Sequence, residues 1–327
     1  MAPIPAKRTF LRFLKSPYDV LNDYPKKRRP FCYERLVVQS FASLLNLPFS
    51  DRDNDCLSAP HRVTWFGSVS SSDKAPSNRP DGIAHAYKFT INIEATLTRG
   101  SDQCVREFGQ ALRHADRIMT ELRVEPRDLY VVLVVRDLSF ETFEAIKASN
   151  AKRATKVIPC ELPTLYFAME TSLLADTMRH IELRQLLQDL DEAVRASANF
   201  QDFRVRAERT ASLWQTHVLE LEKATMLALR SYQAMLLTRR DHAGLSEILL
   251  QLQKDRFLKK YINKIGRMEH SVSAELIENS LLQESLGVVI GRLVTGERLF
   301  APVSILDFRS RCNRRLTKLE SIGASVR

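Results

Sequence analysis

The chain lacks several features that would assign it to a common class of protein. No apolar run among its 327 residues is long enough to span a bilayer, and no apolar core follows the basic N-terminus, so we expect no signal peptide. The five cysteines are odd in number and have no CxxC spacing, which indicates reduced thiols and no disulfide framework or zinc site. We therefore expect a protein of the cytoplasm (nucleoid-associated) or the nucleus that is not secreted and has no contact with membranes.

Common catalytic motifs are also missing. The chain has no glycine-rich phosphate loop, no GxSxG and no HExxH. Cys104 and His114 fall within one predicted helix at a spacing that does not favour a thiol nucleophile.

Positive charge is concentrated at the two ends of the chain. Residues 1–30 carry a net +6 and residues 301–327 a net +4, which together equal the whole excess of +10. Two basic ends on a neutral body are typical of a protein that binds a polyanion, although solvated tails have the same composition. A third basic segment, residues 257–264, interleaves lysines with aromatics, which suits a nucleic-acid surface or a solvated amphipathic helix. The candidate contacts to nucleic acid are Lys26, Lys27, Arg28, Arg29, Arg99, Lys259, Lys260, Arg314 and Arg315.

One strand pattern organises the chain. Residues 87–96 alternate strictly, with Phe89, Ile91 and Ile93 on one face and polar side chains, including Glu94 and Thr96, on the other. This alternation predicts a half-buried strand.

A second carboxylate precedes this strand. Asp81 lies on a short strand predicted over residues 80–85, and a tight turn around Ala86 joins the two strands as antiparallel neighbours. Such neighbours can bring the carboxylates of Asp81 and Glu94 together at one end of a sheet. Mg²⁺ or Mn²⁺ suits such a pair, because Mg²⁺ takes one or two carboxylates and keeps positions open for water and phosphate.

The helix predicted over residues 102–123 has two stripes. The apolar stripe contains Val105, Phe108, Leu112, Ala115, Met119 and Leu122. The polar stripe, nearly opposite, contains Gln103, Glu107, Gln110 and His114. The polar side of an amphipathic helix is usually solvated, so the pattern alone assigns these four residues to the surface.

The stretch from Arg79 to His114 resembles the PD-(D/E)xK nuclease superfamily, in which Pro-Asp on one strand precedes acid-x-Lys on the next. Here the second element is Glu94-Ala95-Thr96, with threonine at the lysine position. This version is similar to the AlwI-type branch of Type IIS restriction and nicking endonucleases. In that branch the strand is followed by leucine, a basic turn and a helix bearing glutamate and histidine, as residues 97–114 are here.

The resemblance implies roles for six residues. Asp81 and Glu94 would bind the metal, Thr96 would orient a water, His114 would act as general base, and Glu107 would be a further metal or water ligand. If the metal itself generates the hydroxide, His114 is dispensable. Glu34, near the start of the first core helix, would join the metal site, although an acid there also suits the helix dipole.

The resemblance also implies an α/β restriction-endonuclease-like domain, with a mixed central sheet flanked by helices. The helical patterns from about Ser172 onward predict an all-α domain after it. We predict a basic arm over residues 1–30, the nuclease-like domain over 31–178, a helical domain over 179–300 and a basic tail over 301–327. The predicted function is a metal-dependent DNA endonuclease of restriction, defence or a mobile element. A homodimer or a partner protein could assemble through the helical domain. Because lysine is missing, an inactive nuclease-like module that binds nucleic acid or serves assembly stays the alternative.

Overall fold

The computed structural model describes residues 7–51, 61–67, 79–86, 89–175, 180–236, 243–244, 247–248, 250, 281, 286–292, 298–302 and 305–325. The chain divides into two compact units. The first contains Met1–Glu170 with Glu182–Leu213, and the second contains Thr171–Ile181 with Trp214–Arg327.

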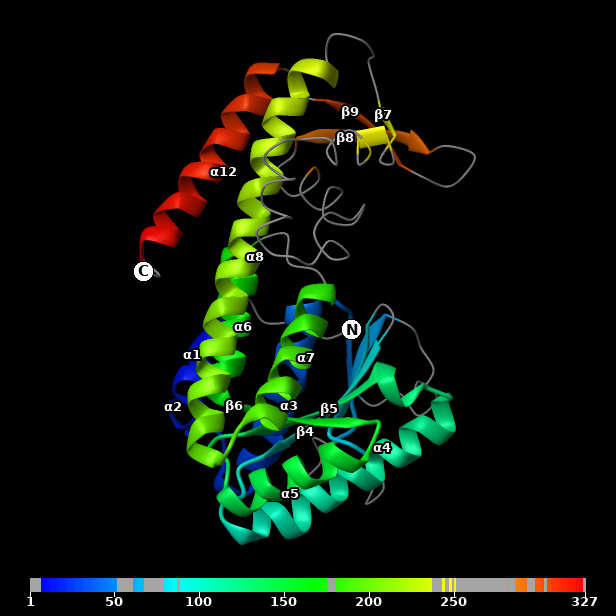
Figure 1. Ribbon diagram of the computed structural model, residues 1–327, viewed down its shortest axis with the longest axis vertical. Coiled ribbons are helices and arrows are strands. Elements are labelled where there is room, and N and C mark those ends of the chain that lie inside the picture. The colour runs from blue at the N-terminus through cyan, green and yellow to red at the C-terminus, as the bar shows by residue number, and fades with distance from the viewer. Residues whose placement is uncertain are drawn as a thin grey trace. The chain divides into compact units, whose positions relative to one another are not determined.

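The first unit is built on a six-stranded mixed sheet (Figure 1). Its strands, in both chain and spatial order, are β1 (Phe49–Asp51), β2 (Arg62–Trp65), β3 (Gly82–Ala86), β4 (Phe89–Thr96), β5 (Leu129–Val135) and β6 (Lys156–Glu161). β3 is antiparallel to both β2 and β4, whereas β1 and β2, β4 and β5, and β5 and β6 pair in parallel. The carboxyl ends of β4, β5 and β6 therefore meet at one edge.

Several helices pack on the sheet. The helical elements up to residue 236 are α1 (Lys7–Lys15), α2 (Pro17–Leu21), η1 (Lys26–Arg28), α3 (Arg29–Leu45), η3 (Gln103–Phe108), α4 (Gly109–Leu122), η4 (Pro126–Asp128), α5 (Phe140–Lys152), α6 (Leu162–Leu174), α7 (His180–Ala196) and α8 (Phe200–Leu236). α3 contacts β2, β3 and β4, and α4 contacts β4 and β5. The mixed sheet flanked by helices confirms the predicted fold class of this part of the chain.

Strand β4 is buried along its whole length, so the predicted half-buried strand is wrong. Its polar face meets α4: the Asn92 amide donates to the carbonyl of Ala111 at 3.4 Å, and Glu94 contacts His114. Its apolar face lies on the other side, where Ile91 and Ile93 are fully buried. Polar residues on this strand are thus turned towards other protein groups, which is how a site is built inside a fold.

Close approach of α3 to the sheet depends on Gly82. A Cβ atom at this position would lie 2.5 Å from Cγ1 of Val38 on α3. α3 itself ends at Asn46, whose φ of 50° is the left-handed conformation that commonly stops a helix.

The predicted basic arm contributes to the core. Phe10, Phe13 and Leu21 on α1 and α2 are fully buried, and the ring of Phe13 lies 5.8 Å from that of Tyr33 on α3. The apolar residues of this segment face the protein while its lysines and arginines stay outside, so its charge and its packing are compatible.

The second unit is mainly helical but also contains strands. β7 (Ala243–Gly244), β9 (Arg298–Pro302) and β8 (Gly287–Arg292) form an antiparallel sheet in that order, and α12 (Ile305–Ser325) follows. The part of the chain that the sequence analysis expects to be all-α therefore contains a strand over residues 287–292. Three β-branched residues, Val288 to Ile290, flanked by glycines favour a strand there. No helix within the described ranges is long and apolar enough to cross a membrane.

Candidate functional site

Asp81 and Glu94 meet at one end of the β3–β4 pair, as the sequence predicts. Asp81 lies directly before β3, and its Oδ2 accepts a hydrogen bond of 2.7 Å from the backbone N–H of Ala95. Glu94 lies within β4, is 7% exposed and accepts hydrogen bonds from the Asn92 side chain and the Asp81 backbone. Antiparallel pairing of Gly82 with Ile93 holds the two carboxylates in this register.

His114 on α4 joins this pair. Its Nδ1 lies 2.7 Å from Oε1 of Glu94, and the side chain is 3% exposed. Burial, with the charges of Arg113 and Arg117, lowers the pKa of His114 to about 4, so the imidazole is neutral at neutral pH. In the tautomer that carries its proton on Nδ1, the neutral ring donates to the Glu94 carboxylate and orients it. The predicted general-base role would then rest on Nε2, which is buried and has no hydrogen-bond partner among the described residues.

Glu107 and Thr96 are linked through Thr98. The Thr98 hydroxyl donates to Oε1 of Glu107 at 3.1 Å, and the Thr98 backbone N–H donates to Oγ1 of Thr96 at 3.0 Å. Thr96 therefore closes the turn after β4, and its own hydroxyl proton is still available to donate.

A π-helical turn explains why the polar stripe faces the sheet. Residues 103–108 form η3, whose wider hydrogen-bonding pattern shifts the phase of the helix that follows. Val105, predicted in the core stripe, is 76% exposed, whereas Gln103 is fully buried and His114 nearly so. The regular helical period used for the prediction does not hold through this turn, so the predicted solvent exposure of Gln103 and His114 is wrong.

Glu34 on α3 lies within electrostatic reach of the other carboxylates. Burial, followed by the charges of Asp81, Glu107 and Glu94, raises the pKa of Glu34 to about 9. Burial and the neighbouring Glu94 carboxylate also raise the pKa of Asp81, and burial raises that of Glu94. Asp81, directly before β3, and the acids of α3, β4 and η3 are therefore close enough for their charges to interact, and burial disfavours the ionised forms of Glu34, Asp81 and Glu94.

Three residues without a predicted role also belong to this region. They are Thr98, Asn92 on the polar face of β4, and Tyr33, whose buried hydroxyl has no hydrogen-bond partner among the described residues. Asn92 could have been found from the strand pattern, since it shares a face with Glu94. Tyr33 could not, because only packing of α3 on the sheet brings it here.

The donor chemistry fits a divalent cation held by two carboxylates. Oxygen ligands such as Asp81 and Glu94 suit Mg²⁺, which keeps several waters. A cation would also offset the burial and, after it, the carboxylate repulsion that raise the pKa values of Asp81 and Glu34. Within the described residues, no three histidine, cysteine, aspartate or glutamate side chains already form a ligand set for a metal.

The predicted nucleic-acid contacts fall in different environments. Lys26, Lys27 and Arg28 are exposed on η1 and Arg29 is half-buried, immediately before the helix that carries Glu34. Arg99 is 55% exposed and lies 3.2 Å from Asp137. Lys259 and Lys260 fall outside the described residues.

Of the two predicted contacts on α12, Arg314 is exposed but Arg315 is not. Arg315 is 2% exposed, and its Nε donates to Oε1 of Glu222 on α8 at 2.6 Å. The prediction that Arg315 contacts DNA conflicts with this burial, because its guanidinium is used within the protein.

The part of the chain that contains the candidate site is similar to known proteins. A model of the AlwI restriction endonuclease family matches residues 72–166, which include Asp81, Glu94, Glu107 and His114. Among solved structures, the chain is similar to the small subunit of the heterodimeric restriction endonuclease R.BspD6I, at 15% identity and a TM-score of 0.45. That match covers 62% of this chain and 97% of that one. No curated protein matches the chain. Residues 72–166 are therefore similar to AlwI-type restriction endonucleases, which confirms the predicted resemblance.

Proposed function

We propose that the protein is a metal-dependent DNA endonuclease whose reaction centre lies at Asp81 and Glu94. The observation that carries this proposal is the meeting of these two carboxylates, through the 2.7 Å hydrogen bond from Ala95 to Asp81, inside the stretch that matches restriction endonucleases. The cytoplasm or the nucleus, where DNA lies, would be the site of action.

In this proposal Asp81 and Glu94 hold the cation, with Glu34 and Glu107 near enough to bind it through water. A bound divalent cation would supply positive charge to the scissile phosphate and acidify the attacking water. Mg²⁺ or Mn²⁺ is the expected ion, since all four acids offer hard oxygen ligands.

The chain's own residues supply orientation. His114 holds the Glu94 carboxylate through the 2.7 Å contact, which fixes the direction of the other carboxylate oxygen. The Thr96 hydroxyl, already an acceptor for Thr98, can donate to a water on the face that it shares with Glu94. Threonine cannot supply the positive charge of lysine, so charge on the phosphate must be balanced by other groups.

The exposed lysines and arginine of η1, before α3, would contact the DNA backbone. Arg314 and residues 257–264 would add contacts from the second unit, which is also where a second copy or a partner protein would assemble.

The test is conversion of supercoiled plasmid to nicked or linear DNA in the presence of Mg²⁺ or Mn²⁺. Wild type is compared with Asp81→Asn, Glu94→Gln and, as a matched control, Glu141→Gln on the exposed first turn of α5. We expect cleavage by wild type and Glu141→Gln, its loss in the two site variants, and its loss in chelator.

Equal cleavage by all four proteins would overturn the assignment of the site. Absence of cleavage by wild type, with salt-dependent DNA binding intact, would favour the inactive nucleic-acid-binding module that the missing lysine makes a real alternative.

A further inference from the structure

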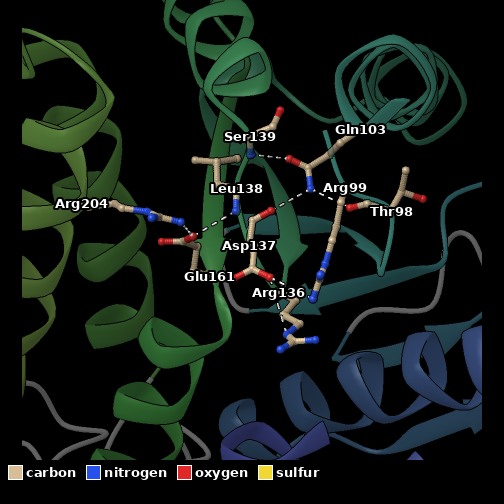
Figure 2. Close-up of polar contacts among 9 residues, drawn as sticks. All are labelled: Thr98, Arg99, Gln103, Arg136, Asp137, Leu138, Ser139, Glu161 and Arg204. Atoms are coloured by element: carbon tan, nitrogen blue, oxygen red, sulfur yellow. Dashed lines mark hydrogen bonds and ion pairs between the residues drawn. The ribbon is translucent and has the colours of Figure 1, made fainter. Parts of the chain in front are cut away.

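Two arginines lie at the edge of the sheet where the candidate site is found. Arg136 directly follows β5, and Arg99 lies three residues after Thr96, the last residue of β4. Because Thr96 pairs with Val135 in the parallel register, the two strands deliver these arginines to the same edge. Figure 2 shows their side chains on neighbouring loops, both directed at Asp137.

The carboxylate of Asp137 holds the two arginines as a pair. Its Oδ2 lies 3.2 Å from Nη2 of Arg99 and 3.6 Å from Nε of Arg136. The side chains of Arg99, Asp137 and Arg136 are 55%, 54% and 37% exposed, so the group faces solvent. Two guanidinium groups against one carboxylate leave a net positive charge.

An aromatic ring also restrains Arg136. The Cζ of Arg136 lies 4.5 Å from the centroid of the Tyr18 ring on α2, which is 40% exposed. Cation–π contact and the carboxylate together fix the guanidinium plane, so less side-chain entropy is lost when a ligand binds.

The buried side-chain amide of Gln103 makes hydrogen bonds to both loops that carry the arginines. Gln103 Nε2 donates to the carbonyls of Thr98 at 2.9 Å and Asp137 at 3.1 Å, and Oε1 accepts from the N–H of Ser139 at 2.9 Å (Figure 2). Glu161 accepts from the N–H of Leu138 at 3.0 Å and ties the same loop to the end of β6. The backbone on both sides of the arginine pair is therefore fixed before any ligand arrives.

One hydrogen bond connects the arginine pair with the carboxylate cluster. Thr98, which precedes Arg99, donates to Glu107 at 3.1 Å.

We propose that Arg99 and Arg136, held by Asp137, form a phosphate-binding pair that grips the DNA backbone beside the scissile phosphate. This inference rests on the proposed function and deepens it, because it assigns to two arginines the positive charge that Thr96 lacks. Guanidinium groups suit the task, since their planar donors match phosphate oxygens. Both guanidinium groups are partly exposed, so a phosphate can approach them while Asp137 stays in place.

The experiment measures binding of a fluorescent DNA duplex over a series of salt concentrations, without divalent cations and in an Asp81→Asn background so that cleavage cannot interfere. Arg99→Gln and Arg136→Gln are introduced separately. The matched control is Arg127→Gln: Arg127 is 84% exposed, lies 3.9 Å from Asp128, and precedes β5 at the opposite end of the strand.

Each phosphate contact contributes about 0.9 to the slope of log affinity against log salt for duplex DNA. We expect Arg99→Gln and Arg136→Gln each to make that negative slope less steep by about 0.9, and Arg127→Gln to leave it unchanged. Slopes equal to that of Arg127→Gln in both variants would overturn the phosphate-binding pair.

The two proposals fail in different ways. If wild type cleaves plasmid but neither arginine variant changes the slope, the nuclease proposal stands and the arginine pair is rejected. If wild type does not cleave but both slopes become less steep, the phosphate-binding pair stands and the nuclease proposal is rejected.

Discussion

The imidazole of His114 and the carboxylate of Glu94 lie 2.7 Å apart, and this contact joins helix α4 to strand β4 inside the candidate site. Both side chains are less than one-tenth exposed, so the imidazole is shielded from solvent. The contact therefore serves to orient the Glu94 carboxylate. In the proposed mechanism, His114 is a positioning residue.

We expect His114→Gln to lower the cleavage rate by about 10- to 100-fold, the usual effect of removing a partner that orients a metal ligand. The pKa of His114 is lowered from 6.5 to about 4, so the ring stays neutral at neutral pH. The dependence of the cleavage rate on pH should therefore have the same shape in the variant as in wild type, with no change near pH 6.5 that is due to histidine. If the wild-type rate changes near that pH and His114→Gln removes the change, His114 is the general base. His85→Gln, at the far end of β3, is the control.

Glu34 should make the metal-free protein less stable as pH rises. Its pKa is raised from 4.5 to about 9, so between these values the unfolded chain has lost a proton that the folded protein keeps. The stability that this proton represents is complete below pH 4.5 and is lost as pH rises through about 9. We expect Glu34→Gln to flatten the fall in the free energy of unfolding across this window, measured by urea denaturation in chelator. Part of the slope should remain, since Asp81 and Glu94 are shifted in the same direction. An unchanged slope, equal to that of Glu141→Gln, would contradict the assignment.

The sequence allowed the central strands of the fold to be predicted because their signals are local. The apolar run from Leu129 to Val135 forms β5, which is buried at every residue. The meeting of Asp81 with Glu94 followed from two short strands joined by a tight turn, since neighbouring antiparallel strands bring their ends together. The pattern of apolar residues, the tight turn and the strand lengths were enough to predict strand β5 and the meeting of the two carboxylates.

What could not be predicted depends on contacts between distant segments. The exposure of Val105 and burial of Gln103 arise from the π-helical turn, which no 3.6-residue pattern contains. The burial of Arg315 requires Glu222, a residue on another helix far away in the chain. Charge composition alone assigns such an arginine to the surface, because an unpaired guanidinium is almost never buried.

Gln103 should be essential for the loops that carry Arg99 and Asp137. Gln103→Leu keeps the approximate volume but leaves two carbonyls and one N–H without their partner. Each such group costs about 1 to 3 kcal/mol, so we expect a loss of at least about 2 kcal/mol in the free energy of unfolding, measured by urea denaturation. The control is Gln185→Leu, which removes one amide contact of 2.7 Å to Asp189 on a helix surface. Such surface pairs contribute about 0.2 to 0.5 kcal/mol. Equal effects of the two substitutions would show that Gln103 does not fasten the loops.

We expect that Gly82 is needed because α3 packs closely against it. The backbone conformation of Gly82 itself does not require glycine. The Cβ of Gly82→Ala would meet the Val38 side chain at 2.5 Å, and relieving this contact moves the helix that carries Glu34. Overpacking of this kind costs about 1 to 3 kcal/mol in the free energy of unfolding. Shortening the neighbour in Gly82→Ala/Val38→Ala should recover part of the loss, which thermal unfolding of the single and double variants would measure. If the double variant is destabilised by the sum of both single changes, the clash is not the cause.

Arg315 should stabilise the second unit through Glu222 and not serve DNA. Both side chains are 1% exposed, Nε of Arg315 donates to Glu222 at 2.6 Å, and its Nη2 donates to the carbonyl of Leu174 at 2.7 Å. Removing one member of a buried pair leaves the other charge in a poorly hydrated place, so we expect Arg315→Met to cost about 3 to 5 kcal/mol. Arg315→Met/Glu222→Leu should recover most of that loss, because replacing a whole buried pair by apolar residues is often neutral.

The control is Arg314→Met, since Arg314 is exposed on the same helix. This variant should leave the free energy of unfolding unchanged and lower DNA affinity instead. Urea denaturation and DNA binding measured on all three variants would decide this, and a loss of DNA affinity in a fully stable Arg315→Met would return that arginine to the DNA surface.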